Sequence, residues 1–158
     1  MKIARHSVAV LCFLAIFVCS SSAFSWGEPK PVPHNDKRAV MEIFHNIDFE
    51  RLEAIVAVSN QSVDGMVRFL REISKGFSAA GYDFDLTVAE GMSSVENMIY
   101  MNKVYGDMFL PVHALMATKE GVAALKKDGV LSYGTIAVIQ KTNSDIKAEE
   151  SRRRASNR

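Results

Sequence analysis

The clearest pattern of hydrophobic and polar positions in this chain lies between residues 62 and 81. Apolar side chains recur there every three or four positions, the spacing that places them along one face of an α-helix. They are Val63, Met66, Val67, Leu70, Ile73 and Phe77. Ser62 is suited to cap the start of the helix with its hydroxyl, and Gly81 to end it in a left-handed conformation. The segment therefore predicts one amphipathic helix.

A second segment, residues 95–109, is apolar around most of its helical circumference. Only a narrow polar line remains, at Glu96, Lys103 and Asp107. A helix of this composition lies at the centre of a bundle or at an interface, and Pro111 ends or kinks it. We therefore expect this segment to be a central apolar helix that also offers surface to a partner.

Shorter apolar sets at helical spacing occupy residues 40–47, 49–58 and 118–128. Asp36 precedes the first set and Thr118 begins the last, and both residue types are favoured as helix caps. Gly129 follows the last set, where a left-handed glycine commonly stops a helix. These segments predict further short helices.

Two segments fit either type of secondary structure. Residues 82–88 alternate between apolar and polar side chains, as in a half-buried strand, but Asp85 is also suited to cap a short helix. Residues 134–140 are rich in β-branched side chains and also fit a helical face. We expect helices in both, because an isolated strand needs a partner for its backbone. The predicted fold is all-α, a small bundle of about five short-to-medium helices; the alternative is α+β, with these two segments paired as strands.

The amino terminus has the three parts of a secretory signal peptide. Lys2 and Arg5 precede an apolar run at residues 8–19, and small side chains follow. The run is about a dozen residues, shorter than the ~20 that span a bilayer. Residues 1–25 are therefore predicted to be a cleavable signal. Cleavage after Ser25 is favoured, with cleavage after Ala23 as the alternative.

Cleavage removes both cysteines, Cys12 and Cys19, from the chain. The mature protein then has no disulfide, no thiolate nucleophile and no cysteine metal ligand. Residues 26–35 carry alternating prolines and are predicted to form an extended arm. A single helical domain is expected at residues 36–146, followed by a charged, disordered tail at residues 147–158. No second apolar segment approaches the length of a membrane span.

The charge balance of the mature chain excludes one class of function. Removal of Lys2 and Arg5 leaves 17 basic residues against 18 acidic ones. Five of the basic residues lie in the carboxy-terminal tail, so the preceding body is mildly acidic. This is not the profile of a dedicated nucleic-acid binder, and we expect a protein partner, either another secreted or periplasmic (envelope) protein or a second copy of the chain.

Motifs that carry catalysis are missing from the sequence. It contains no H-E-x-x-H pair, no G-x-S-x-G turn and no glycine-rich phosphate loop. Neither a cofactor nor an enzymatic activity is therefore expected. The favoured hypothesis is an exported helical protein that acts through protein–protein interaction, as an adaptor, chaperone-like subunit, inhibitor or secretion accessory. A hydrolase with a scattered active site is the last-ranked alternative.

The apolar helix supplies the candidate functional residues. The candidate interaction surface consists of Met98, Met101, Tyr105, Met108 and Phe109. The alternative is a small-ligand or copper carrier, because thioethers and imidazole suit monovalent copper. Its candidate ligands are Met98, Met101, His113 and Met116. Core packing is the favoured role of these methionines, since methionine is a common filler of irregular cores.

Overall fold

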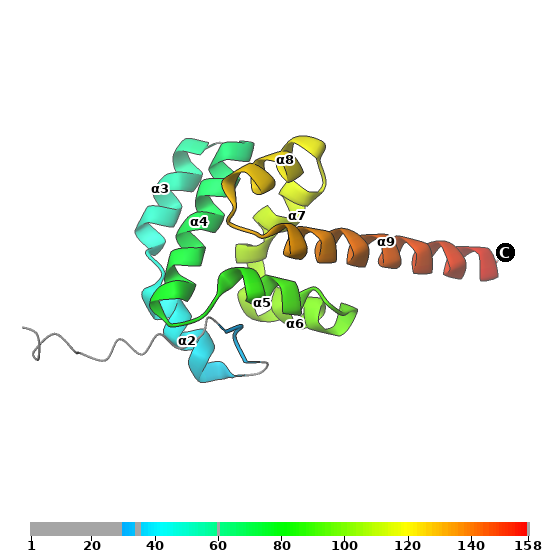
Figure 1. The fold of residues 1–158 in the computed structure, drawn as a ribbon, viewed down its shortest axis with the longest axis horizontal. Coiled ribbons are helices and arrows are strands. Elements are labelled where there is room, and N and C mark those ends of the chain that lie inside the picture. Colours follow the sequence, from blue (N-terminus) through cyan, green and yellow to red (C-terminus); the bar gives the residue numbers. More distant parts are fainter. Residues whose placement is uncertain (1–29, 34–35, 60, 158) are drawn as a thin grey trace, which may run out of the picture.

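The structure is a computed structural model of the 158-residue chain, and it describes residues 30–33, 36–59 and 61–157. The predicted signal peptide and residues 26–29 of the arm lie outside the described residues. Within the described part the chain is a helical bundle without a strand (Figure 1). The helices are α2 (Lys37–Asn46), α3 (Phe49–Ser59), α4 (Val63–Ala79), α5 (Phe84–Gly91), α6 (Val95–Tyr105), the 3₁₀ turn η1 (Gly106–Phe109), α7 (Leu110–Met116), α8 (Lys119–Asp128) and α9 (Tyr133–Ser156). The all-α prediction is confirmed.

Side-chain caps start the helices where local sequence indicates. The carboxylate of Asp36 accepts from the backbone N–H groups of Arg38 and Ala39 at the start of α2. The hydroxyls of Ser62 and Thr118 likewise accept from backbone N–H groups three residues later. These bonds satisfy donors that the first turn of a helix leaves unpaired.

The segments at 82–88 and 134–140 meet in space, but as helices α5 and α9. Asp83, rather than Asp85, caps α5 by accepting from the Leu86 N–H at 3.1 Å. Asp85 instead reaches across to the start of α9, where its carboxylate accepts from the N–H of the cap residue Ser132 at 2.7 Å. The α+β alternative is therefore wrong, because local caps and this cross-link satisfy the backbone without a strand ladder.

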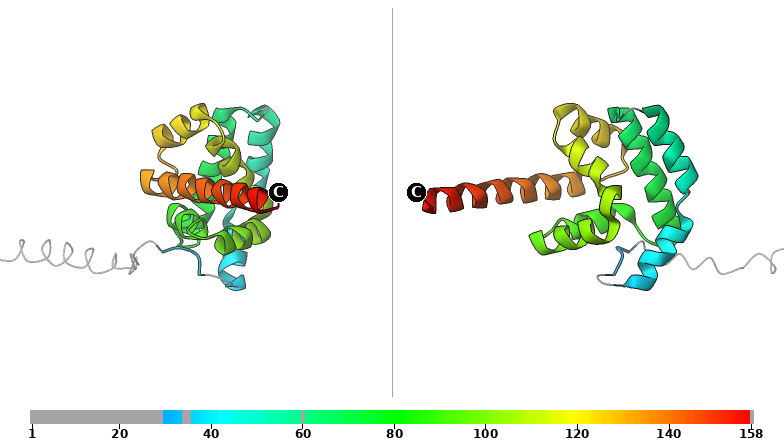
Figure 2. Two further views of the ribbon diagram at one scale, coloured as in Figure 1. Left: turned by 90° about the vertical axis from the view of Figure 1, so that its right-hand side faces the viewer. Right: turned by 180° about the vertical axis from the view of Figure 1, so that it is seen from behind.

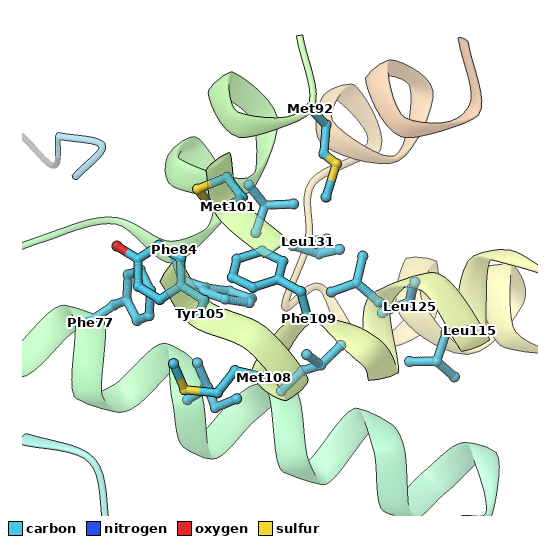
Figure 3. Close-up of a cluster of buried hydrophobic side chains, with 14 of the residues drawn as sticks. Phe77, Phe84, Met92, Met101, Tyr105, Met108, Phe109, Leu115, Leu125 and Leu131 are labelled. Atoms are coloured by element: carbon cyan, nitrogen blue, oxygen red, sulfur yellow. The ribbon is translucent and has the colours of Figure 1, made fainter. Parts of the chain in front are cut away.

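Helix α4 occupies the centre of the bundle. It packs against α2, α3, α5, α7 and α8, and its Leu70, Ile73 and Phe77 side chains are fully buried. Phe77 begins an aromatic cluster in which ring centroids lie 5.1 Å from Phe84 and 5.7 Å from Tyr105 (Figure 3). The centre is thus the strongest amphipathic helix rather than the most apolar one.

The apolar segment 95–109 is not one helix. It breaks at Gly106, whose φ of +48° is a conformation that favours glycine. The break turns Met108 and Phe109 into the core, while Val95 and Ile99 at the other end remain 48% and 60% exposed. Met101 and Tyr105, which precede the break, are buried as well, so both halves of the segment contribute side chains to the core.

Helix α9 leaves the bundle and projects from it (Figure 2). Its first half is anchored by buried side chains at Ile136, Ile139 and Thr142. Residues 147–156, for which the sequence predicts a disordered tail, continue the helix instead. Ion pairs one turn apart, between Glu149 and Arg152 and between Glu149 and Arg153, accompany this extension. None of the described helices is both long enough and apolar enough to cross a bilayer.

Candidate interaction surface

The five residues predicted as an interaction surface lie mainly in the core. Met101, Tyr105, Met108 and Phe109 are each no more than 7% exposed, and Met98 is partly buried against the same cluster. Figure 3 shows the first four among the phenylalanine and leucine side chains of the bundle. The prediction is corrected on this point, because an apolar stripe in the sequence cannot show which side a second layer of helices covers.

Exposed apolar surface occurs elsewhere, in a groove between α3 and the η1–α7 segment. One hollow of about 540 Å³ is lined by apolar side chains from three elements, namely Val56, Met66, Phe69, Leu110, Pro111 and Ala114. A neighbouring hollow of about 380 Å³ shares Val56, Phe69 and Asp107 with it and continues to Phe49. We call the two together the α3–α7 groove.

The packing of three helices creates this groove. Helix α3 packs on α4, and α7 packs on α4 as well, so α4 forms the floor between two helical walls. Leu52 of α3 is buried against the core, whereas Val56, one turn later, remains 55% exposed. On the opposite wall Leu110 is 58% exposed. Large apolar side chains are therefore exposed to solvent on both walls of the groove.

The charge of the groove has one sign. Glu53 and Asp107 are the charged residues that line the two hollows, and among the described residues no lysine, arginine or histidine lines either of them. Both carboxylates are exposed at its rim. An apolar floor with an acidic rim favours a ligand that pairs apolar side chains with positive charges.

The four candidate copper ligands are not gathered by the contacts that the structure records. The Met101 side chain packs against Gly91 of α5, whereas Nε2 of His113 lies 3.3 Å from Oδ1 of the neighbouring Asn102. Met101 on α6 and His113 on α7 therefore have different recorded neighbours. Met98 and Met116 pack against the core from partly buried positions.

His113 has a structural environment. Its ring is half-buried, and burial lowers the pKa of its imidazole below the ordinary value because the charged form loses water. Among the described residues, no three histidine, cysteine, aspartate or glutamate side chains are placed to hold a metal ion together. The hydrogen bond to Asn102 links α7 to α6, which is a bundle-stabilising contact.

A hollow of about 430 Å³ lies between α4 and α8, and one ion pair crosses it. Arg71 of α4 forms an ion pair with Asp128 of α8, whose carboxylate is 7% exposed. Arg68 and Lys127 line the same hollow opposite Asp64. This arrangement connects two helices and resembles a structural contact more than a recognition site.

The α3–α7 groove was not foreseen from sequence, although one signal was present. Val56 and Val58 extend the apolar face of their helix beyond what Leu52 needs for burial, and Leu110 lies beside Pro111 at the start of α7. Val56 and Leu110 are 54 positions apart in the sequence, so only the fold brings them to one site. Comparison of the chain with protein-family models, with curated proteins and with solved structures finds no match.

Proposed function

We propose that this chain is an exported helical protein that acts by binding another protein through the α3–α7 groove. The observation that carries the proposal is the pair of adjoining hollows of about 540 and 380 Å³, lined by exposed Val56 and Leu110. Exposed apolar area gathered in a groove is typical of binding sites in proteins that are otherwise polar outside. The partner is expected to be another secreted or envelope protein.

The ligand that fits best is an amphipathic helix with a basic flank. A groove between two helices accepts a third helix, whose apolar residues at every third or fourth position serve as anchors. Glu53 and Asp107 at the rim would then face lysine or arginine side chains of the ligand. Rim charges of this kind contribute orientation and association rate more than affinity.

Export is the second half of the proposal, and residues 1–25 support it. Their basic start, apolar middle and small residues before Trp26 have the order of a cleavable signal. The mature chain is free of cysteine, so its fold does not depend on the redox conditions of the compartment. Its stability then comes from the apolar core around α4.

A peptide-binding experiment tests the groove. The probe is a fluorescein-labelled amphipathic helix made of leucine and lysine, and its matched control replaces each lysine by glutamate. Fluorescence anisotropy is expected to show binding of the lysine peptide that is at least about tenfold tighter, because two acidic groups repel the control. Val56→Glu and Leu110→Glu are each expected to weaken the lysine peptide by about tenfold or more, because each places a charge among the apolar anchors.

Ile99→Glu is the control variant for these substitutions. Ile99 is 60% exposed, close to the 58% of Leu110, but it lies on α6 outside the groove. Its substitution should leave peptide affinity unchanged. Equal effects of Ile99→Glu and Leu110→Glu, or equal affinity for both peptides, would show that the groove is not a specific binding surface.

A further inference from the structure

The outer part of α9 is a helix that no other element of the described chain covers. Every residue from 147 to 157 is exposed, and Figure 2 shows this part extending away from the bundle. We call residues 147–157 the α9 tip. Thr142 is the last buried residue of the helix, and at a rise of 1.5 Å per residue Arg153 lies about 16 Å further along the axis. The fold therefore holds the tip clear of the body.

Charge is distributed unevenly between this end of the chain and the rest of it. Residues 26–146 contain 12 lysines and arginines against 16 aspartates and glutamates, whereas residues 147–158 contain five against two. Residues 151–158 contain four arginines and no acidic residue. The body is thus net negative and the end of α9 is net positive. A separation of about 16 Å is roughly twice the Debye length at physiological ionic strength, so solvent ions screen the body from the arginines.

The arginines of the α9 tip remain available despite their intramolecular ion pairs. Glu149 pairs with Arg152 at 3.5 Å and with Arg153 at 3.1 Å, yet both arginine side chains are 77% exposed. Exposed pairs of this kind are weak, because water and salt compete for both groups. Arg154 forms no ion pair with a described residue. An external anion can therefore replace Glu149 at little cost.

The arrangement of these charges suits a broad anionic surface better than a shaped protein site. Consecutive residues of a helix point about 100° apart, so residues 152–154 cover most of the circumference rather than one face. Protein interfaces are centred on apolar or aromatic side chains packed into pockets, and the largest apolar side chain in the α9 tip is alanine. A helix is about 10 Å across, close to one Debye length, so all three arginines act on any surface that the tip touches.

We propose that the α9 tip binds the surface of a membrane that contains anionic phospholipids. Each lysine or arginine near such a surface strengthens binding by about fivefold. The attachment is reversible, because the tip adds no apolar side chain or lipid anchor to the attraction between charges. The outer half of α9 then acts as a spacer that keeps the acidic body, with the α3–α7 groove, away from the negative headgroups. Binding at the groove is not required for this attachment.

Sedimentation with lipid vesicles tests the proposal. The purified protein is mixed with vesicles of equal parts phosphatidylglycerol and phosphatidylcholine, or of phosphatidylcholine alone, whose binding measures any contribution that does not need charge. Binding to the anionic vesicles in 0.1 M salt is expected to be at least about tenfold tighter. The difference should disappear in 1 M salt, where the Debye length falls from about 10 Å to about 3 Å.

Replacement of Arg152, Arg153 and Arg154 together by glutamine should abolish most of this preference, with at least about a tenfold loss of affinity for the anionic vesicles. Replacement of the same three residues by lysine should retain it, because the charge is kept. Cations in the last turn also stabilise a helix, so circular dichroism of both variants reports whether the helix is intact.

The matched control replaces Arg38, Lys103 and Lys119, which are exposed on α2, α6 and α8, by glutamine. This variant loses the same net charge from the body and should bind the anionic vesicles within about twofold of the natural protein. Equal losses in the two glutamine variants would show that net charge, and not the α9 tip, governs binding.

Two further outcomes would overturn the proposal. One is equal affinity for anionic and neutral vesicles in 0.1 M salt. The other is tighter binding of poly-glutamate than of the anionic vesicles, compared per negative charge, which would identify an acidic polypeptide as the partner. Leu110→Glu should leave vesicle binding unchanged while it weakens the lysine peptide, so this proposal and that of the groove can fail independently.

Discussion

The hydroxyl of Thr142 donates to the backbone carbonyl of Met92 at 2.5 Å, in a buried contact that joins α9 to the end of α5. Met92 is 1% exposed and Thr142 is 9% exposed. This bond lies at the point where α9 leaves the bundle, beyond the last fully buried residue, Ile139. It is one polar anchor of a helix whose outer half projects from the bundle (Figure 2).

Replacement of Thr142 by valine removes this donor while keeping the side-chain shape. The Met92 carbonyl would be left buried without that partner, and the expected loss is about 1–3 kcal/mol in the free energy of unfolding. Urea denaturation followed by circular dichroism measures it. Ser144→Ala, on the exposed side of the same helix, should change stability by less than about 0.5 kcal/mol. Similar losses in both variants would mean that the bond from Thr142 to Met92 is not the cause.

Replacement of Tyr105 by phenylalanine removes a buried hydroxyl that has no hydrogen-bond partner among the described residues, and it leaves the ring in place. Tyr105→Phe should be more stable than the natural protein by about 1 kcal/mol, because no hydrogen bond is lost and a desolvated polar group is eliminated. Thermal and urea unfolding measure the difference. Tyr133→Phe is the control, since Tyr133 is 69% exposed. A clear destabilisation in Tyr105→Phe alone would reveal a partner for the hydroxyl.

The half-buried His113 makes stability depend on pH. Burial lowers the pKa of its imidazole in the folded protein, so the unfolded chain binds the proton more tightly. The contribution of His113 is complete above its unfolded pKa of about 6.5, and it is lost as the pH falls from there toward the folded value. Urea midpoints measured between pH 7.5 and 5.5 should therefore decrease.

His113→Gln is expected to remove this part of the pH dependence, because glutamine retains a donor for Asn102 but does not titrate. His45→Gln is the matched control, since His45 is exposed on α2. If the control flattens the pH profile and His113→Gln does not, the dependence originates outside the α6–α7 contact.

Export predicts a defined new amino terminus. Protein recovered from the outside of an expressing cell should begin at Trp26, or at Phe24 if the alternative bond is cut. Ala23→Lys should block both, because residue 23 lies one position before one bond and three before the other. Glu28→Lys, beyond both bonds, is the control. Amino-terminal sequencing that finds residues 1–25 retained in the exported natural protein would contradict the prediction.

Local sequence determined where most helices begin and that the fold is all-α. Asp36, Ser62 and Thr118 cap α2, α4 and α8 because a side-chain oxygen needs only the next backbone N–H groups. The apolar residues of α4, spaced three or four positions apart, also indicated which face of the helix is buried. Only that face can pack against the core, because the opposite face is polar. Such information is contained within a dozen neighbouring residues.

Tertiary structure decided everything that depends on distant neighbours. The segment with Met101, Tyr105 and Phe109 is apolar on nearly all sides, so its pattern could not show that Gly106 breaks it or which of its side chains the core buries. The α3–α7 groove joins Val56 to Leu110, and a small cavity joins Val32 to Tyr105. The helix after Ser62, which has the clearest pattern in the sequence, lies at the centre of the bundle, because five other helices pack against it.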